Sequence, residues 1–169
     1  SRFGEALQIR LITSLSALML LWSLAVNLGN SGGMEPLMYV PVINPIDLAH
    51  VVFFISIARA LTLLKNHDPR IKNALMVGLG GLSFIWLSAL LLRSMHHYAG
   101  VPFDVGYMLN DVRVQTALSI LWTIIGMLAM LLAARKKFRS LWIAGAVLVT
   151  IVLIKMFFID LGASGTVER

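Results

Sequence analysis

The sequence contains no cysteine, few charged residues and none of the short motifs typical of soluble enzymes. Without cysteine, the 169-residue chain forms neither a disulfide bond nor a zinc site with thiolate ligands. Charged residues make up 13% of the sequence, about half the share typical of a soluble domain. The glycines of GLGG (78–81) lie inside an apolar run, so they do not form a dinucleotide-binding loop. These absences exclude a zinc finger and a disulfide scaffold.

Hydrophobic residues, in contrast, are abundant. They make up 59% of the chain, and the mean hydropathy is +0.86. A bilayer is the natural solvent for so much apolar surface. The net charge is +6 and the pI is about 10.2, but the cations sit in short loops between apolar runs, where they set membrane orientation. We therefore expect a membrane protein whose surroundings are the lipid bilayer, with no nucleic-acid partner.

The apolar residues fall into five segments, roughly 7–28, 45–65, 71–97, 112–134 and 141–161. Each has the ~20 residues that a helix needs to cross a ~30 Å hydrocarbon core. The first segment is too long for the core of a signal peptide and lacks a small-residue cleavage site after it. The predicted fold is an all-α integral membrane bundle of about five transmembrane helices, forming a single domain over 1–169. The abrupt ends suggest a piece of a longer multi-pass protein.

Local sequence predicts where several of these helices begin. Asn44 is suited to cap the second helix, Pro45 fits its first position, and Asp47 favours the positive end of its dipole. Asp68 is the expected cap of the third helix. Asn110 or Asp111 is expected to cap the fourth.

The loop charges predict an orientation. The loops at 29–44 and 98–111 contain no Lys or Arg. The N-terminal flank and the other two loops carry the cations Arg2, Arg10, Lys65, Arg70, Lys72, Arg135, Lys136, Lys137 and Arg139. Because positive loops stay in the cytoplasm, we predict a cytoplasmic N-terminus and a periplasmic C-terminus in a bacterial inner membrane.

Polar residues at membrane depth are concentrated toward the predicted outer side. They include both signs of charge, and such residues in a membrane default to a functional-site hypothesis. Arg93 lies three and four residues before the two histidines of the third segment, so all three share one side of a helix. The predicted ligand-binding cluster comprises Asn44, Asp47, His50, Arg93, His96, His97, Asp111, Gln115, Lys155 and Asp160.

Each of these residues also has a simpler interpretation. Lys155 and Arg93 are long enough to extend to the headgroups, and histidines at helix ends are often interfacial. His96 and His97 point about 100° apart on a helix, which disfavours one ion between them. We therefore predict no metal site and no cofactor. The concentration of both charge signs on one side is what these simpler interpretations leave unexplained.

Several of the polar residues lie in longer motifs. These are Pro41–Leu48, Arg93–Pro102 (RSMHHYAGVP), Gln115–Trp122, Leu141–Gly145 and Lys155–Leu161. In this order they resemble the bacterial predicted membrane proteins grouped as domain of unknown function 2339. The resemblance extends from about Tyr39 to Arg169. It implies a C-terminal portion of a longer chain with more spans, and it carries no established activity. The recurring motif residues map onto Asn44, Pro45, Asp47, His96, His97, Gln115, Trp122, Lys155 and Asp160.

Two hypotheses do not involve catalysis. In the first, a membrane-embedded binding or transport module uses Arg93, Arg113 and Lys155 to hold an anionic headgroup, a glycan or an ion. The rest of a longer chain, or other membrane subunits, would complete the cavity. In the second, the polar cluster fixes helix register in a membrane assembly and binds no ligand.

A third hypothesis is an enzyme that modifies lipid-linked or envelope glycans. It requires an acid or base, for which His96, His97 and Asp47 are the candidates. No spacing in the sequence fixes a nucleophile, so the catalytic residues of such an enzyme are not identified.

Overall fold

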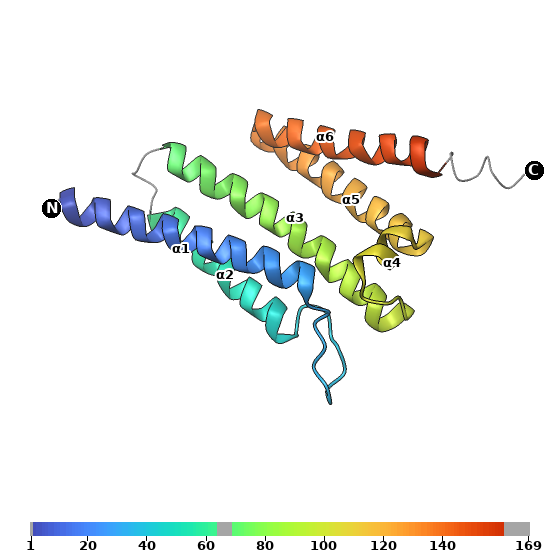
Figure 1. The fold of residues 1–169 in the computed structure, drawn as a ribbon. Coiled ribbons are helices and arrows are strands. Elements are labelled where there is room, and N and C mark those ends of the chain that lie inside the picture. The colour runs from blue at the N-terminus through green and yellow to red at the C-terminus, as the bar shows by residue number, and fades with distance from the viewer. Residues whose placement is uncertain (1, 64–68, 161–169) are drawn as a thin grey trace, which may run out of the picture. The chain divides into compact units, whose positions relative to one another are not determined.

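The computed structural model describes residues 2–63 and 69–160 (Figure 1). Apart from one isolated β-bridge, the regular structure of these residues is helical. The elements are α1 (Arg2–Gly29), α2 (Pro45–Leu63), α3 (Pro69–Ala99), α4 (Val105–Asn110), α5 (Val112–Lys136), α6 (Arg139–Lys155) and the π-helical turn η2 (Met156–Asp160). The all-α prediction is confirmed, and each predicted segment falls on a long helix. The short helix α4 was not predicted.

The chain divides into two compact units, Ser1–Tyr107 and Met108–Arg169, here called the N-unit and the C-unit. The N-unit contains α1, α2 and α3, and the C-unit contains α5, α6 and η2. A single domain over 1–169 stays a prediction.

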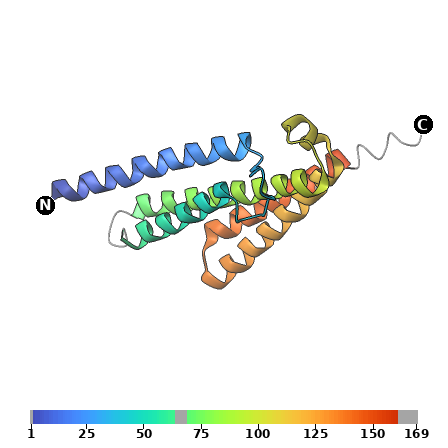
Figure 2. The ribbon, with the colours of Figure 1, turned by 90° about the horizontal axis from the view of Figure 1, so that it is seen from below.

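In the N-unit, the helices α1, α2 and α3 run alongside one another (Figures 1 and 2). The middle helix in sequence, α2, runs opposite to the other two. As a result, the end of α1, the start of α2 and the end of α3 meet at one end of the unit. The three helices therefore alternate in direction along the chain.

The start of α2 has the predicted cap. The side-chain oxygen of Asn44 accepts a hydrogen bond from the Asp47 backbone N–H at 3.0 Å, and Pro45 is the first helical residue. This arrangement satisfies one of the backbone donors that a helix start leaves without a partner. The other predicted cap, Asp68, lies outside the described residues.

The loop between α1 and α2 folds against the end of α3. The Tyr98 hydroxyl donates to the Tyr39 carbonyl at 2.7 Å, and the Tyr39 ring stacks on the His97 ring with centroids 4.2 Å apart. Gly32 lies beneath this contact in a left-handed conformation with φ +74°. A Cβ atom there would lie 3.1 Å from the Tyr39 ring and 3.2 Å from Arg93 Cδ, so both the conformation and the space require glycine.

The C-unit is an antiparallel hairpin of α5 and α6 whose backbones approach closely at two glycines. A Cβ atom on Gly145 would lie 2.7 Å from the Gly126 carbonyl oxygen, and one on Gly126 would lie 2.8 Å from Val149 Cγ2. Small residues of this kind let membrane helices pack by direct backbone contact. At the hairpin turn, Lys137 ends α5 in the left-handed conformation, with its N–H donating to the Ala133 carbonyl.

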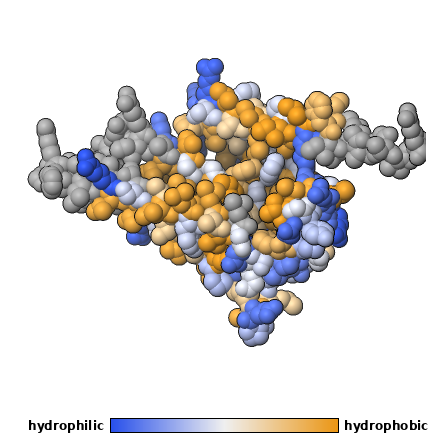
Figure 3. Space-filling view, in the orientation of Figure 1, coloured by the Kyte–Doolittle hydropathy of each residue, from blue (hydrophilic) through white to orange (hydrophobic). Residues whose placement is uncertain are grey.

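Much of the described surface is apolar, as Figure 3 shows for one face. Within residues 2–63 and 69–160, three helical stretches are long and apolar enough to cross a membrane: Leu75–Ala99, Val112–Lys136 and Arg139–Phe158. A shorter apolar stretch, Ala17–Asn27, lies in α1. Membrane spans in α3, α5 and α6 agree with the sequence prediction, whereas spans in α1 and α2 stay predictions.

Candidate functional site

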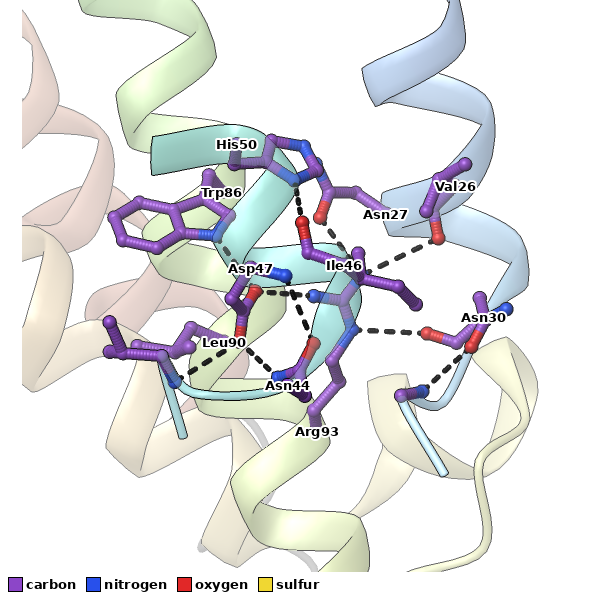
Figure 4. A network of polar contacts seen from close by, with 12 residues as sticks. Val26, Asn27, Asn30, Asn44, Ile46, Asp47, His50, Trp86, Leu90 and Arg93 are labelled. Atoms are coloured by element: carbon purple, nitrogen blue, oxygen red, sulfur yellow. Dashed lines mark hydrogen bonds and ion pairs between the residues drawn. The ribbon is translucent and has the colours of Figure 1, made fainter. Parts of the chain in front are cut away.

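An ion pair between Asp47 and Arg93 lies at the centre of a polar cluster in the N-unit (Figure 4). One guanidinium nitrogen of Arg93 lies 2.9 Å from Asp47 Oδ1, and neither side chain has any exposed area. The pair connects the first turn of α2 to the last turns of α3. We call the surrounding set of hydrogen-bonded side chains, all buried except the half-buried Trp86, the Asp47–Arg93 network: Ser23, Asn27, Asn44, Asp47, His50, Trp86 and Arg93.

The carboxylate of Asp47 receives four donors. Oδ1 accepts from Arg93 at 2.9 Å and from the Trp86 indole N–H at 2.8 Å. Oδ2 accepts from the Val42 backbone N–H at 3.2 Å and from the side-chain amide of Asn44. A carboxylate has about four lone-pair positions, so this one has its full complement of hydrogen bonds.

The guanidinium of Arg93 binds α1 as well as α2. Its Nε donates to the Asn30 carbonyl at 3.1 Å, and its Nη2 donates to Asn27 Oδ1 at 3.0 Å and, at 3.5 Å, to the Val26 carbonyl. These acceptors lie at the C-terminal end of α1, where a helix leaves carbonyl groups without partners and favours positive charge. One side chain therefore joins the ends of all three helices.

The hydrogen bonds around His50 determine its tautomer. Its Nδ1 lies 2.7 Å from the Ile46 carbonyl, which accepts only, so Nδ1 carries a proton. Asn27 presents its oxygen to Arg93 and therefore its NH₂ group to His50 Nε2, 3.0 Å away. Nε2 must then be the acceptor, which also suits the nearby Ser23 hydroxyl. These hydrogen bonds hold the His50 ring between α1 and the first turn of α2.

The charges of the network cancel. Arg93 contributes one positive charge and Asp47 one negative charge. Removing two charges from water is costly, and a buried pair recovers that cost only when its remaining hydrogen-bonding groups are also satisfied. The four donors to Asp47 and the α1 acceptors of Arg93 meet this requirement.

Aromatic rings pack around His50 and Trp86, next to the ion pair. The His50 ring stacks on Trp86 with centroids 6.3 Å apart, and it lies 5.6 Å from the Trp22 ring. Phe54 packs edge-on against Trp86. Each of α1, α2 and α3 contributes a ring, so apolar contacts support the same junction that the ion pair forms.

The adjacent histidines of α3, His96 and His97, donate to carbonyl groups of the neighbouring loops. His96 Nδ1 lies 2.7 Å from the Val101 carbonyl, and His97 Nε2 lies 2.9 Å from the Ser31 carbonyl. Both of these nitrogens act as donors because a carbonyl oxygen only accepts. Neighbouring Tyr39 is buried, and its hydroxyl has no hydrogen-bond partner among the described residues. Burial, assisted by the charge of Asp47, raises the pKa of Tyr39 above its usual value.

In the C-unit, Asp111 caps α5. It is one of the two residues predicted as this cap. Its carboxylate accepts from the Arg113 and Val114 backbone N–H groups and from the Arg113 guanidinium at 2.9 Å. The Arg113 side-chain hydrogen bond, followed by the backbone hydrogen bonds, lowers the pKa of Asp111 below its usual value. This ion pair is exposed and local, being formed by residues two apart.

Lys155 connects the two helices of the hairpin. Its ammonium donates to the Gln115 carbonyl and to the Ser119 hydroxyl, both at 2.9 Å. The Gln115 side chain turns away and donates to the Leu109 carbonyl at 2.7 Å. Lys155 therefore binds the backbone carbonyl of Gln115 rather than its side-chain amide.

The family of the chain follows from its sequence match over nearly the whole length. The family model described as "Predicted membrane protein (DUF2339)" matches residues 3–169. The chain belongs to the DUF2339 family. No curated protein and no solved structure gives a significant match. The resemblance seen in the motifs is thus confirmed, and the match begins well before Tyr39, the approximate start of that resemblance.

The structure of this DUF2339 chain places the predicted site residues in three groups. Asn44, Asp47, His50 and Arg93 converge in the network, while the two adjacent histidines bind loop carbonyls. Asp111, Gln115 and Lys155 make their contacts within the C-unit. The side chain of Asp160 lies outside the described part of the structure. Among the described residues, no group of three or more His, Asp or Glu side chains is placed to hold a metal ion.

Sequence reasoning missed Ser23, Asn27 and Trp86. The first two stood out weakly, as polar residues four apart on one face of an apolar segment. Trp86 lies seven residues before Arg93, two helical turns away on the same face, but an aromatic residue in an apolar segment gives no signal of its own. The carboxylate that its indole N–H binds comes from another helix.

Proposed function

We propose that the DUF2339 chain is a structural membrane module in which the Asp47–Arg93 network fixes the register of α1, α2 and α3. One observation carries this proposal: Asp47, Arg93, Asn44 and His50 have no exposed area, and their hydrogen bonds are directed at one another and at helix ends. A site for a ligand would have polar groups directed at open space.

Register is a property that apolar helix contacts specify weakly in a membrane, because lipid tails are as apolar as leucine. A buried polar contact has one favourable arrangement and a heavy cost for every other. Sliding α3 by one turn, about 5 Å, would separate Arg93 from both Asp47 and the α1 carbonyls. The network therefore favours one alignment of the three helices over its neighbours.

The binding or transport hypothesis and the enzyme hypothesis use the same residues differently. Each requires Asp47, Arg93 or His50 to give up a present partner in exchange for a ligand. His96 and His97 bind loop carbonyls, so in this arrangement their rings connect α3 to the loops. Because the polar groups of the network already bind one another, we favour the structural role over both alternatives.

Replacing the ion pair by apolar residues tests the proposal. The double variant Asp47→Leu/Arg93→Met removes both buried charges together, so we expect it to be more stable than either single variant in thermal unfolding. Register is measured separately by cross-linking a cysteine at Leu20 to one at Gly78, since a Cβ at Gly78 lies 3.7 Å from Leu20 Cδ1. A cysteine at Leu75, one turn away on α3, is the reporter for a shifted register.

With the native ion pair, we expect cross-linking at Gly78 and little at Leu75. In the double variant, both positions should react, because the helices no longer have a single alignment. Arg113→Gln, which removes the exposed ion pair of the C-unit, is the matched control and should leave the pattern unchanged. A double variant that keeps the native pattern overturns the proposed role.

We also propose that the network end of the N-unit faces the periplasm of a bacterial inner membrane, with a cytoplasmic N-terminus and the α5–α6 turn in the cytoplasm. The support is the contrast between the loop at 29–44, without Lys or Arg, and the cation-rich turn around Lys137. Because the chain has no cysteine, single cysteines at Gly33 and Lys137 can be labelled without background. Labelling from opposite sides is expected, and labelling from the same side refutes this orientation.

A further inference from the structure

The ammonium of Lys155 has a donor that the described part of the chain does not use. An ammonium group has three N–H donors. Two are directed at the Gln115 carbonyl and the Ser119 hydroxyl. Of the carboxylates whose side chains the structure describes, none forms an ion pair with Lys155. Lys155 is partly exposed, so we infer that an acceptor from outside can approach its third donor.

A groove of about 260 Å³ is lined in part by Ser119, the residue that Lys155 binds. Its walls are mainly apolar, with Ile120 and Ile124 from α5, Val152 from α6 and Met156 from η2. The volume lies just below the range of about 300–1,000 Å³ for small-molecule pockets, so it suits a section of a longer molecule.

The hydroxyl groups along the groove do not supply further donors. Thr116 donates to the Val112 carbonyl, Thr123 to the Ser119 carbonyl, and Ser119 to the Gln115 carbonyl. Among the groups beside the groove, Lys155 is thus the donor left for an anion. The groove consequently has one cationic point next to an apolar channel, which is the complement of an amphiphile with an anionic head.

The position of Lys155 in the candidate span gives the class of amphiphile. Lys155 lies three residues before the end of Arg139–Phe158, or about 5 Å along the helix axis. A lysine side chain at that depth reaches the phosphate level of the bilayer. A carboxylate on a helix of a second copy would need to be buried beside apolar groove walls, whereas a lipid phosphate already lies at this level.

We propose that the α5–α6 hairpin binds an anionic phospholipid, with the phosphate on the Lys155 ammonium and an acyl chain along Ile120, Ile124 and Val152. This site lies in the C-unit and does not depend on the Asp47–Arg93 network. The structural role of the N-unit and the lipid site can therefore fail separately.

Native mass spectrometry of the full chain tests the proposal. The protein is equilibrated with mixed micelles that contain equal amounts of phosphatidylglycerol and phosphatidylcholine, and the retained lipid is identified. We expect retention of phosphatidylglycerol, with at least a five-fold loss in Lys155→Met and little loss in Lys155→Arg. Lys136→Met, which removes an exposed cation from the other end of the hairpin, should retain the lipid. Ile124→Trp, which fills the groove but keeps Lys155, should also lose it.

Four outcomes would overturn the proposal. The first is equal retention by the Lys155→Met and Lys136→Met variants, and the second is equal retention of the two lipids. The third is a loss of self-association in Lys155→Met without a change in the amount of retained lipid. That result would assign the groove to a second copy of the chain. Displacement of the lipid by inorganic phosphate alone would also count against it, because the groove would then add nothing to the anion site. The Lys155→Arg variant controls for the structural contacts of the ammonium. It should keep those contacts and therefore unfold less readily than Lys155→Met.

Discussion

Two ion pairs of the described chain have the same N···O separation of 2.9 Å and opposite surroundings. The side chains of Arg93 and Asp47 are fully buried, whereas those of Arg113 and Asp111 are 63% and 21% exposed. The first pair joins residues on different helices, and the second joins neighbours at the start of one helix. Distance alone would rank the pairs as equal. Their effect on stability should differ because only the buried pair would leave a charge without solvent when broken.

The largest effect should come from Asp47→Ala. This change leaves the Arg93 guanidinium buried beside α1 without its counter-charge, and it also removes the acceptor of the Trp86 indole N–H. Breaking a buried pair from one side costs about 3–5 kcal/mol. Reversible unfolding in mixed micelles should show this loss. A loss below about 1 kcal/mol would mean that water reaches the guanidinium and that the network is open.

A smaller loss is expected for Arg93→Lys. The positive charge remains, but an ammonium cannot reproduce the planar set of bonds to Asp47, Asn27 and the Asn30 carbonyl. Losing one charged hydrogen bond costs about 2 kcal/mol. The same unfolding measurement should place this variant between Asp47→Ala and the native chain. Equal stability of Arg93→Lys and the native chain would show that charge alone, without the fork of donors, holds the helices.

Changes at Asp111 should act through the helix cap. Asp111→Ala removes the acceptor for two backbone N–H groups at the start of α5, whereas Asp111→Asn keeps a good cap without the charge. We therefore expect the alanine variant to unfold at a lower temperature than the asparagine variant, with both closer to the native chain than Asp47→Ala. If the asparagine variant were the less stable of the two, charge rather than capping would be the contribution of Asp111.

The same residue gives a pH dependence of known sign. Because the Arg113 and backbone hydrogen bonds lower the folded-state pKa of Asp111, its contribution is fully present above the unfolded pKa, about 4. It is lost as the pH falls through the lower folded-state value. The stability difference between the native chain and Asp111→Asn should thus shrink below about pH 4. A difference that grows on acidification would reverse the assigned sign.

The smallest effect should come from Arg113→Gln. An exposed pair is screened by water and salt, and holding two side chains together opposes the small attraction. The melting temperature should change little, and the small remaining difference should disappear at high salt. A melting temperature lowered as far as in Arg93→Lys would erase the contrast between the two pairs.

The parts of the fold that could be read from the sequence are those with local causes. The apolar segments, the Asn44 cap with Pro45, and the Asp111 cap each depend on residues within a few positions of one another, and all are found in the structure. The helix α4 was missed because its six residues lie in a loop between two longer apolar segments.

The candidate site was predicted in its residue types but not in its pairing. Asp47 and Arg93 are 46 residues apart, and their contact depends on how far α3 is shifted along α2, which no local pattern specifies. The chain also offered other partners of similar chemistry, such as Asp111 for Arg93 and the adjacent histidines for Asp47. Ser23 and Asn27 carry no charge, so they attracted little attention although they complete the bonds of His50.

The fixed direction of the hydrogen bonds from Asp47 to His50 has a consequence for membrane energetics. A buried chain of polar groups inside a bilayer is a potential proton wire, which would dissipate the gradient across the membrane. Here the chain passes through the Arg93 guanidinium, which does not release a proton in proteins, and through the Asn27 amide. Protons cannot hop along that route. The hydrogen bonds therefore join the three helices without forming a path for protons between Asp47 and His50.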